Sequence, residues 1–205
     1  MTETAASAHT TADRRPALAA AYRHAGGVVA GVRPDQLSGA TPCPDYDVAT
    51  LIDHLVGAGW RAVAIGRGET PTGEQPFPHV ELTDAPQQLR EAGAQATATW
   101  TDDRLTATTT MPWGETYTGA TLVDMYLSEL MAHAWDLAVA TGQTPGCDQE
   151  LATAALAAAH SMLRPEYRDA MGIGNPFGAE QPAGDDATTL ERFAAFMGRR
   201  IDWRP

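Results

Sequence analysis

The chain contains no lysine: its 14 basic residues are all arginines, set against 26 acidic residues and a net charge of −12. The protein therefore cannot form a lysine Schiff base or hold a lysine-bound pyridoxal cofactor. It also cannot build a Walker A phosphate loop, which needs a lysine. The acidic balance argues against nucleic acid and against an anionic membrane surface as partners, because phosphate binding needs clustered positive charge.

Cysteine is scarce as well. Cys43 and Cys147 lie far apart and form no CxxC pair, so no disulfide framework is expected, and each is interpreted as a small packed residue rather than a nucleophile. The N-terminus has no basic start followed by an apolar segment, which argues against a signal peptide. No apolar run reaches the roughly 18 residues that a membrane span needs. We therefore expect a cytoplasmic protein without a membrane partner.

A length of 205 residues, with 43% hydrophobic and 20% charged residues, is typical of a folded globular chain. We expect a disordered polar tail over residues 1–12 and one domain over residues 13–205. Periodicity, cap residues and turn formers predict helices at about 14–32, 48–68, 85–101, 118–141, 147–164 and 187–200. A short hairpin or an extended loop is expected before the fourth helix. The predicted fold class is all-α, a four-helix bundle with a short extra C-terminal helix.

The fourth predicted helix, LVDMYLSELMAHAWDLAVA, is apolar almost all round, as central helices are. Glu129 and His133 lie one turn apart on one face, and Asp136 returns to within about 20° of Glu129. A buried carboxylate without a partner would be costly, so this polar stripe needs compensation. Either Glu129 and His133 form a local pair on a partly wet face, or they offer oxygen and nitrogen to a metal ion.

A metal site would need a third ligand from a facing helix. Of the six histidines, His54 is the best placed, because it lies inside the second predicted helix beside small residues that permit close approach. The remaining candidates lie in the tail, in a Pro-rich loop, near the end of the first helix and in the fifth helix. We interpret them as solvated or hydrogen-bonded: His9, His79, His24 and His160.

Two segments, TPCPDYDVATLIDHLVG and LSELMAHAWDLAVATGQ, resemble the DinB-like, mycothiol-dependent maleylpyruvate isomerase family. The closing segment NPFGAEQPAGDDATTLERFAAFMGRRIDW is similar to the tail of its small actinobacterial branch of metal-binding proteins. The resemblance spans nearly the whole chain from the first helix on. It implies a four-helix bundle that holds a divalent metal through one histidine and an ExxxH pair, which are His54, Glu129 and His133 here.

In that family the open metal positions take waters or a thiol cofactor. The resemblance implies a divalent-metal-dependent enzyme that acts on a small electrophile, either a mycothiol-type S-transferase or a thiol-assisted isomerase. Zinc is the expected ion, with nickel, iron or manganese as alternatives. The isomerase itself has a further C-terminal domain for which 205 residues leave no room, so metal binding is expected to carry over better than the isomerase reaction. The alternatives are a thiol-independent hydrolase, isomerase or cyclase of a specialised-metabolite pathway, or a non-catalytic metal- or ligand-binding protein.

Asp136 and Arg61 are the further catalytic candidates. Asp136 could orient a ligand or a substrate, and Arg61 lies on the histidine-bearing face of the second helix, where it could meet an anionic thiol. Trp60, Trp113 and Tyr117 could line a cofactor pocket, although aromatic residues at such positions are more often part of a core. A small-molecule substrate is the expected partner, and the fold often dimerises, which leaves a homodimer open.

Overall fold

The computed structural model describes residues 12–73, 77–163, 168 and 177–205. The tail expected over residues 1–12 lies outside this part of the chain, except for its last residue. Within the described residues, the secondary structure is almost entirely helical and includes one two-stranded sheet. The predicted all-α class is confirmed.

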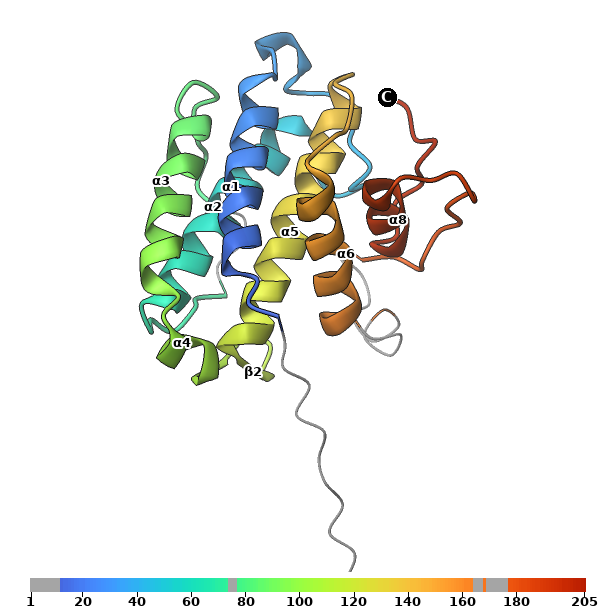
Figure 1. The fold of residues 1–205 in the computed structure, drawn as a ribbon. Helices are drawn as coiled ribbons and strands as arrows, with labels where there is room; N and C mark the ends of the chain where they lie inside the picture. Colours follow the sequence, from blue (N-terminus) through green and yellow to red (C-terminus); the bar gives the residue numbers. More distant parts are fainter. Residues whose placement is uncertain (1–11, 74–76, 164–167, 169–176) are drawn as a thin grey trace, which may run out of the picture.

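Four helices form the predicted bundle (Figure 1). They are α1 (Arg15–Ala30), α2 (Val48–Gly66), α3 (Ala85–Thr99) and α5 (Gly119–Ala140). Helices α1 and α2 each pack against both α3 and α5, so that all four contribute to one apolar core. This arrangement brings the middle of α2 against the middle of α5, the two helices that carry the candidate metal ligands.

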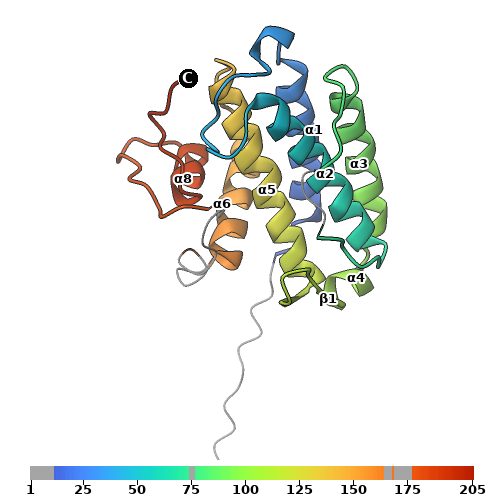
Figure 2. The ribbon, with the colours of Figure 1, turned by 180° about the vertical axis from the view of Figure 1, so that it is seen from behind.

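Two further helices extend the bundle beyond α5. Helix α6 (Gln149–Met162) packs on α5, and α8 (Thr189–Phe196) packs mainly on α6. Seen from both sides, α6 and α8 lie across α5 from α3 (Figures 1 and 2). The last residues of the chain therefore return to α5 on the side away from α3.

The short elements include the predicted hairpin and one helix that the sequence did not predict. Strands β1 (Thr108–Thr110) and β2 (Thr116–Thr118) pair antiparallel directly before α5, as expected. The additional helix is α4 (Asp102–Thr106), and a 3₁₀ turn, η1, covers Pro34–Gln36. Helix α4 has five residues, too few to show a helical period in the sequence.

Side-chain caps set the starts of the helices that carry the site. The Asp47 carboxylate accepts a hydrogen bond from the Thr50 amide, and the Thr118 hydroxyl accepts one from the Thr121 amide. At the start of α1, Arg14 is the N-cap, and the preceding Asp13 accepts a hydrogen bond from the Arg15 amide.

Helix α2 is long and apolar enough to cross a membrane by length and composition, which the sequence analysis did not expect of any segment. About 56% of the relevant window is buried against the rest of the protein. The same length and hydropathy occur in core helices of globular proteins, and the packing of α2 between α3 and α5 accounts for its apolar character.

Candidate metal centre

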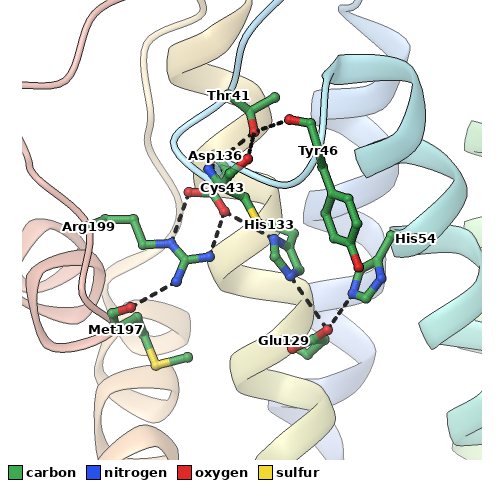
Figure 3. Close-up of polar contacts among 9 residues, drawn as sticks. All are labelled: Thr41, Cys43, Tyr46, His54, Glu129, His133, Asp136, Met197 and Arg199. Atoms are coloured by element: carbon green, nitrogen blue, oxygen red, sulfur yellow. Dashed lines mark hydrogen bonds and ion pairs between the residues drawn. The ribbon is translucent and has the colours of Figure 1, made fainter. Parts of the chain in front are cut away.

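Three predicted ligands meet between α2 and α5. His54 extends from α2, and Glu129 and His133 lie one turn apart on α5 (Figure 3). Glu129 Oε1 lies 2.6 Å from His54 Nε2 and 3.5 Å from His133 Nε2. One ligand atom from each side chain lies within 4.8 Å of the other two. The structure thus brings together a nitrogen–oxygen–nitrogen donor set from two helices.

The chemistry of this cluster fits a divalent metal ion. His133 is fully buried, and its Nε2 makes no hydrogen bond to any described residue. A buried ring nitrogen without a partner is costly, and a metal ion would satisfy it. Two imidazoles and one carboxylate are a common ligand set for zinc, which leaves further positions for water or substrate.

Glu129 carries the negative charge of the cluster. Burial alone would raise the pKa of its carboxyl group, but the imidazoles of His133 and His54 hold that pKa well below its usual value. The Glu129 side chain is therefore ionised at neutral pH, as a metal ligand must be. The side chains of His54 and Glu129 are 14% and 19% exposed, whereas His133 has no exposed surface. Solvent thus reaches the cluster from the side of His54 and Glu129.

His133 is held from behind by Asp136. Asp136 Oδ2 lies 3.0 Å from His133 Nδ1 and accepts its proton, and His133 Nε2 is directed at Glu129. Burial alone would lower the pKa of His133, but the carboxylates of Glu129 and Asp136 raise it to about 9, so a metal ion would have to displace the Nε2 proton at neutral pH. Burial alone would raise the pKa of Asp136, but the charge of Arg199 and the hydrogen bond from His133 lower it. The sequence analysis weighed Asp136 as a group that orients a ligand, and the structure places it where it orients His133.

Arg199 completes this arrangement, and the sequence analysis did not single it out. Its Nε and Nη2 donate to the two oxygens of Asp136 at 3.1 and 2.8 Å, and its Nη1 donates to the carbonyl of Met197 at 2.8 Å (Figure 3). Gly198 turns the chain between them with a φ of +86°, and a Cβ there would lie 2.7 Å from the Gly178 amide nitrogen. Only glycine allows this turn without strain.

A second feature that the sequence analysis missed is a loop over the two histidines. The Tyr46 ring lies 5.0 Å from the His54 ring and 6.5 Å from the His133 ring, measured between centroids. The hydroxyl of Thr41 is within hydrogen-bond distance of the carbonyl oxygens of Cys43 and Tyr46, and it stabilises the loop in this position.

Phe77 and Arg61 lie on the His54 side of the cluster. The edge of the Phe77 ring faces the His54 ring at 5.6 Å, and the guanidinium carbon of Arg61 lies 4.4 Å above the Phe77 ring. Gly57 follows His54 by three residues on α2 and leaves the space that Phe77 fills, because a Cβ there would lie 2.1 Å from the Phe77 ring. The small residue Gly57 beside His54 thus permits the close approach of a loop, in addition to the approach of α5 at Glu129.

Comparisons with known proteins identify relatives of the chain. The model of the mycothiol maleylpyruvate isomerase N-terminal domain matches residues 18–138. The chain belongs to this family. Two uncharacterized proteins from two strains of Mycobacterium tuberculosis are each 34% identical to the chain over 174 residues, which is 85% of this chain and 91% of theirs. No solved structure matches the chain.

The match to the mycothiol maleylpyruvate isomerase family includes the three candidate ligands and Asp136, but it ends before Arg199.

The three aromatic residues predicted to line a cofactor pocket make no ring contact with the cluster that the structure records among its described residues. Trp113 is 54% exposed and its ring lies 6.4 Å from that of Tyr117, at the hairpin. The hairpin precedes Glu129 by about 16 Å of helix. Trp60 is half-buried against the core of the bundle. A role for these residues in cofactor binding stays a prediction.

Proposed function

We propose that this member of the mycothiol maleylpyruvate isomerase family is a divalent-metal-dependent enzyme, with zinc the first candidate ion. It joins a small thiol of the mycothiol type to a carbon electrophile, as an S-transferase or a thiol-assisted isomerase. The observation that supports this function best is the convergence of His54, Glu129 and His133, in which the buried Nε2 of His133 makes no hydrogen bond to a described residue. These residues would hold the ion and leave a side open toward solvent.

A divalent ion at this point would supply positive charge that lowers the pKa of a thiol or a water molecule, so that the anion forms near neutral pH. The protein contributes the arrangement around it. Asp136 keeps the inner nitrogen of His133 protonated and the outer one available. The rings of Tyr46 and Phe77 flank His54 and narrow the approach of solvent to it. Arg61, beyond Phe77, places a positive charge near the open side, which favours a ligand with an anionic group.

An external nucleophile is needed because the described residues offer no strong nucleophile of their own. Burial raises the pKa of the Cys43 thiol to about 11, and burial also raises the pKa of Cys147. A thiol with a raised pKa is mostly protonated at neutral pH and therefore reacts slowly. The chain also has no lysine. The nucleophile is thus a small thiol or a water molecule, and the family name favours the thiol.

The decisive experiment measures thiol consumption by zinc-loaded protein. Mycothiol and a panel of small electrophiles, maleylpyruvate included, are incubated with the wild-type protein and with a His54→Ala variant. We expect thiol-dependent turnover of one electrophile by the wild type, and a loss of at least a hundredfold in the variant, since metal ligands are essential to such sites. A His160→Ala variant is the matched control, because His160 contacts Phe196 on α8 and not the cluster.

Each other outcome is informative. Full turnover in the rigorous absence of thiols would replace the thiol by water and make the protein a hydrolase, isomerase or cyclase. Tight zinc binding without turnover of any electrophile would favour a metal- or ligand-binding protein. Equal zinc binding by the wild type and by His54→Ala would show that the proposed centre is wrong.

A further inference from the structure

Arg199 connects the C-terminal segment to the candidate metal centre. It follows Asp136 by 63 residues and lies beyond the region that the family model matches. His133 and Asp136 have no exposed surface, and Arg199 is 5% exposed. The three side chains form a continuous buried line from the turn after α8 to the face of α5 that carries Glu129 (Figure 3).

We propose that Arg199 is a positioning residue of the metal centre, acting through Asp136 on His133. This inference rests on the metal binding in the proposed function and extends it to a part of the chain that no comparison assigns to the site. It predicts that the affinity for the metal depends on the docking of the segment Met197–Arg199 against Asp136 on α5. The reverse also holds: metal binding stabilises the docked segment, because the coupling between two sites is reciprocal.

The geometry explains why Arg199 acts on the ring and not only on the fold. Asp136 Oδ2 is shared, since it accepts from Arg199 Nη2 at 2.8 Å and lies 3.0 Å from His133 Nδ1. The planar guanidinium fixes the plane of the carboxylate through two bonds, and this plane sets the direction in which the imidazole can be held. Without Arg199 nothing among the described residues would fix the plane of the buried carboxylate, and the orientation of His133 would be lost.

The two histidines differ in this respect. Nδ1 of His54 is buried and makes no hydrogen bond to a described residue, whereas Nδ1 of His133 has Asp136. Of the two histidine ligands, only His133 is therefore held in orientation by a hydrogen bond from Nδ1 to a described residue. Removal of a group that hydrogen-bonds to a metal ligand typically weakens metal binding by 10–100-fold.

A second buried ion pair on the same helix provides a matched control. Arg14 Nη1 contacts both carboxylate oxygens of Asp124 at 3.2 Å, and their side chains are 13% and 4% exposed. Asp124 precedes Asp136 by 12 residues on α5, near the other end of the helix, and it also accepts a hydrogen bond from Ser161. Arg14→Gln thus removes a buried arginine–aspartate pair from α5 without touching the cluster.

The first measurement is the zinc affinity of each purified full-length protein, by competition with a chromophoric chelator and zinc alone. We expect Arg199→Gln to lose about 10–100-fold in affinity. Arg199→Lys should recover part of that loss, because an ammonium keeps the charge but cannot make the planar two-bond contact. Arg14→Gln should lower the unfolding temperature but leave the zinc affinity within about twofold of the wild type, as expected for a distant, independent site.

The second measurement needs no variant to fold. Amide hydrogen exchange of the wild type is followed with and without zinc, at the amides of Met197 and Arg199, which bond to the carbonyls of Phe193 and Ala194. We expect slower exchange at these amides when zinc is bound. Zinc-independent exchange there, or unchanged zinc affinity in Arg199→Gln, would overturn the inference. A wild type that binds zinc would then still satisfy the proposed function, whereas a wild type that binds no zinc would overturn both.

Discussion

At the scale of single residues, burial decides which groups can react. Cys43 is 4% exposed, and burial raises the pKa of its thiol to about 11. Cys147 is half-buried, and burial again is the main cause of its raised pKa. The neighbouring charges do not reverse this effect at Cys43, because Arg199 lowers the pKa less than burial raises it. The two thiols are thus packing residues, as the sequence analysis interpreted them.

This difference in burial predicts an order of reactivity. At pH 8 the fraction of Cys43 present as thiolate is about a hundredfold below that of a thiol with a pKa of 9, so iodoacetamide should modify the folded protein slowly. Cys147 should react before Cys43. Both rates should rise with pH, since a raised pKa moves deprotonation upward, and both should reach the ordinary rate in denaturant. Mass spectrometry after timed quenching measures the order, and fast labelling of Cys43 at pH 7 would contradict it.

At the scale of elements, the contact between α2 and the loop at Phe77 depends on the absence of a side chain. Gly57 lies in α2, and a Cβ there would overlap the near atoms of the Phe77 side chain, so the whole residue would have to move. Because the Phe77 ring is packed against His54, such a movement would also change the side of the candidate centre that faces solvent. Gly27 lies on the exposed face of α1 and would meet nothing within 4 Å.

The two glycines therefore predict opposite effects for the same substitution. Gly57→Ala should lower the free energy of unfolding by about 1–3 kcal/mol, the usual cost of overpacking. Gly27→Ala should raise it by about 0.5–1 kcal/mol, because alanine is the better helix former. Urea denaturation followed by circular dichroism measures both. A stabilised Gly57→Ala protein would show that the loop gives way without cost.

Cap residues and helical periodicity made the helices predictable from the sequence. Parts of the site were not predictable, because they depend on contacts between residues far apart in the chain. Asp47 and Thr118 precede apolar helical patterns and cap them, and Glu129 and His133 share a face by spacing alone. The contact of Tyr46 with the histidines depends on how a connector folds back, and no period in the sequence encodes that. Arg199 pairs with Asp136 across 63 residues. The sequence does not distinguish Arg199 from the adjacent Arg200, which is exposed.

At the scale of the whole molecule, the candidate centre joins two helices and should therefore contribute to global stability. An ion that binds only the folded state stabilises it by about 4 kcal/mol when the free ion is a thousand times its dissociation constant. For a chain of this size that corresponds to roughly 10 °C in the unfolding temperature. Chelation should lower the unfolding temperature of the wild type by this order and leave His133→Ala nearly unchanged. Differential scanning calorimetry with and without a chelator measures the difference, and equal shifts would place the stabilising ion elsewhere.

The order of synthesis follows from the distance between Asp136 and Arg199 along the chain. All three candidate ligands have been made by residue 133, whereas the arginine that positions His133 comes 63 residues after Asp136. At about 5–20 residues per second, a ribosome needs roughly 3–13 s for that interval. During this time a nascent chain can present the donor set before its final geometry is available. An ion that binds at this centre would therefore find the geometry that Arg199 holds only after that residue has been made and has docked.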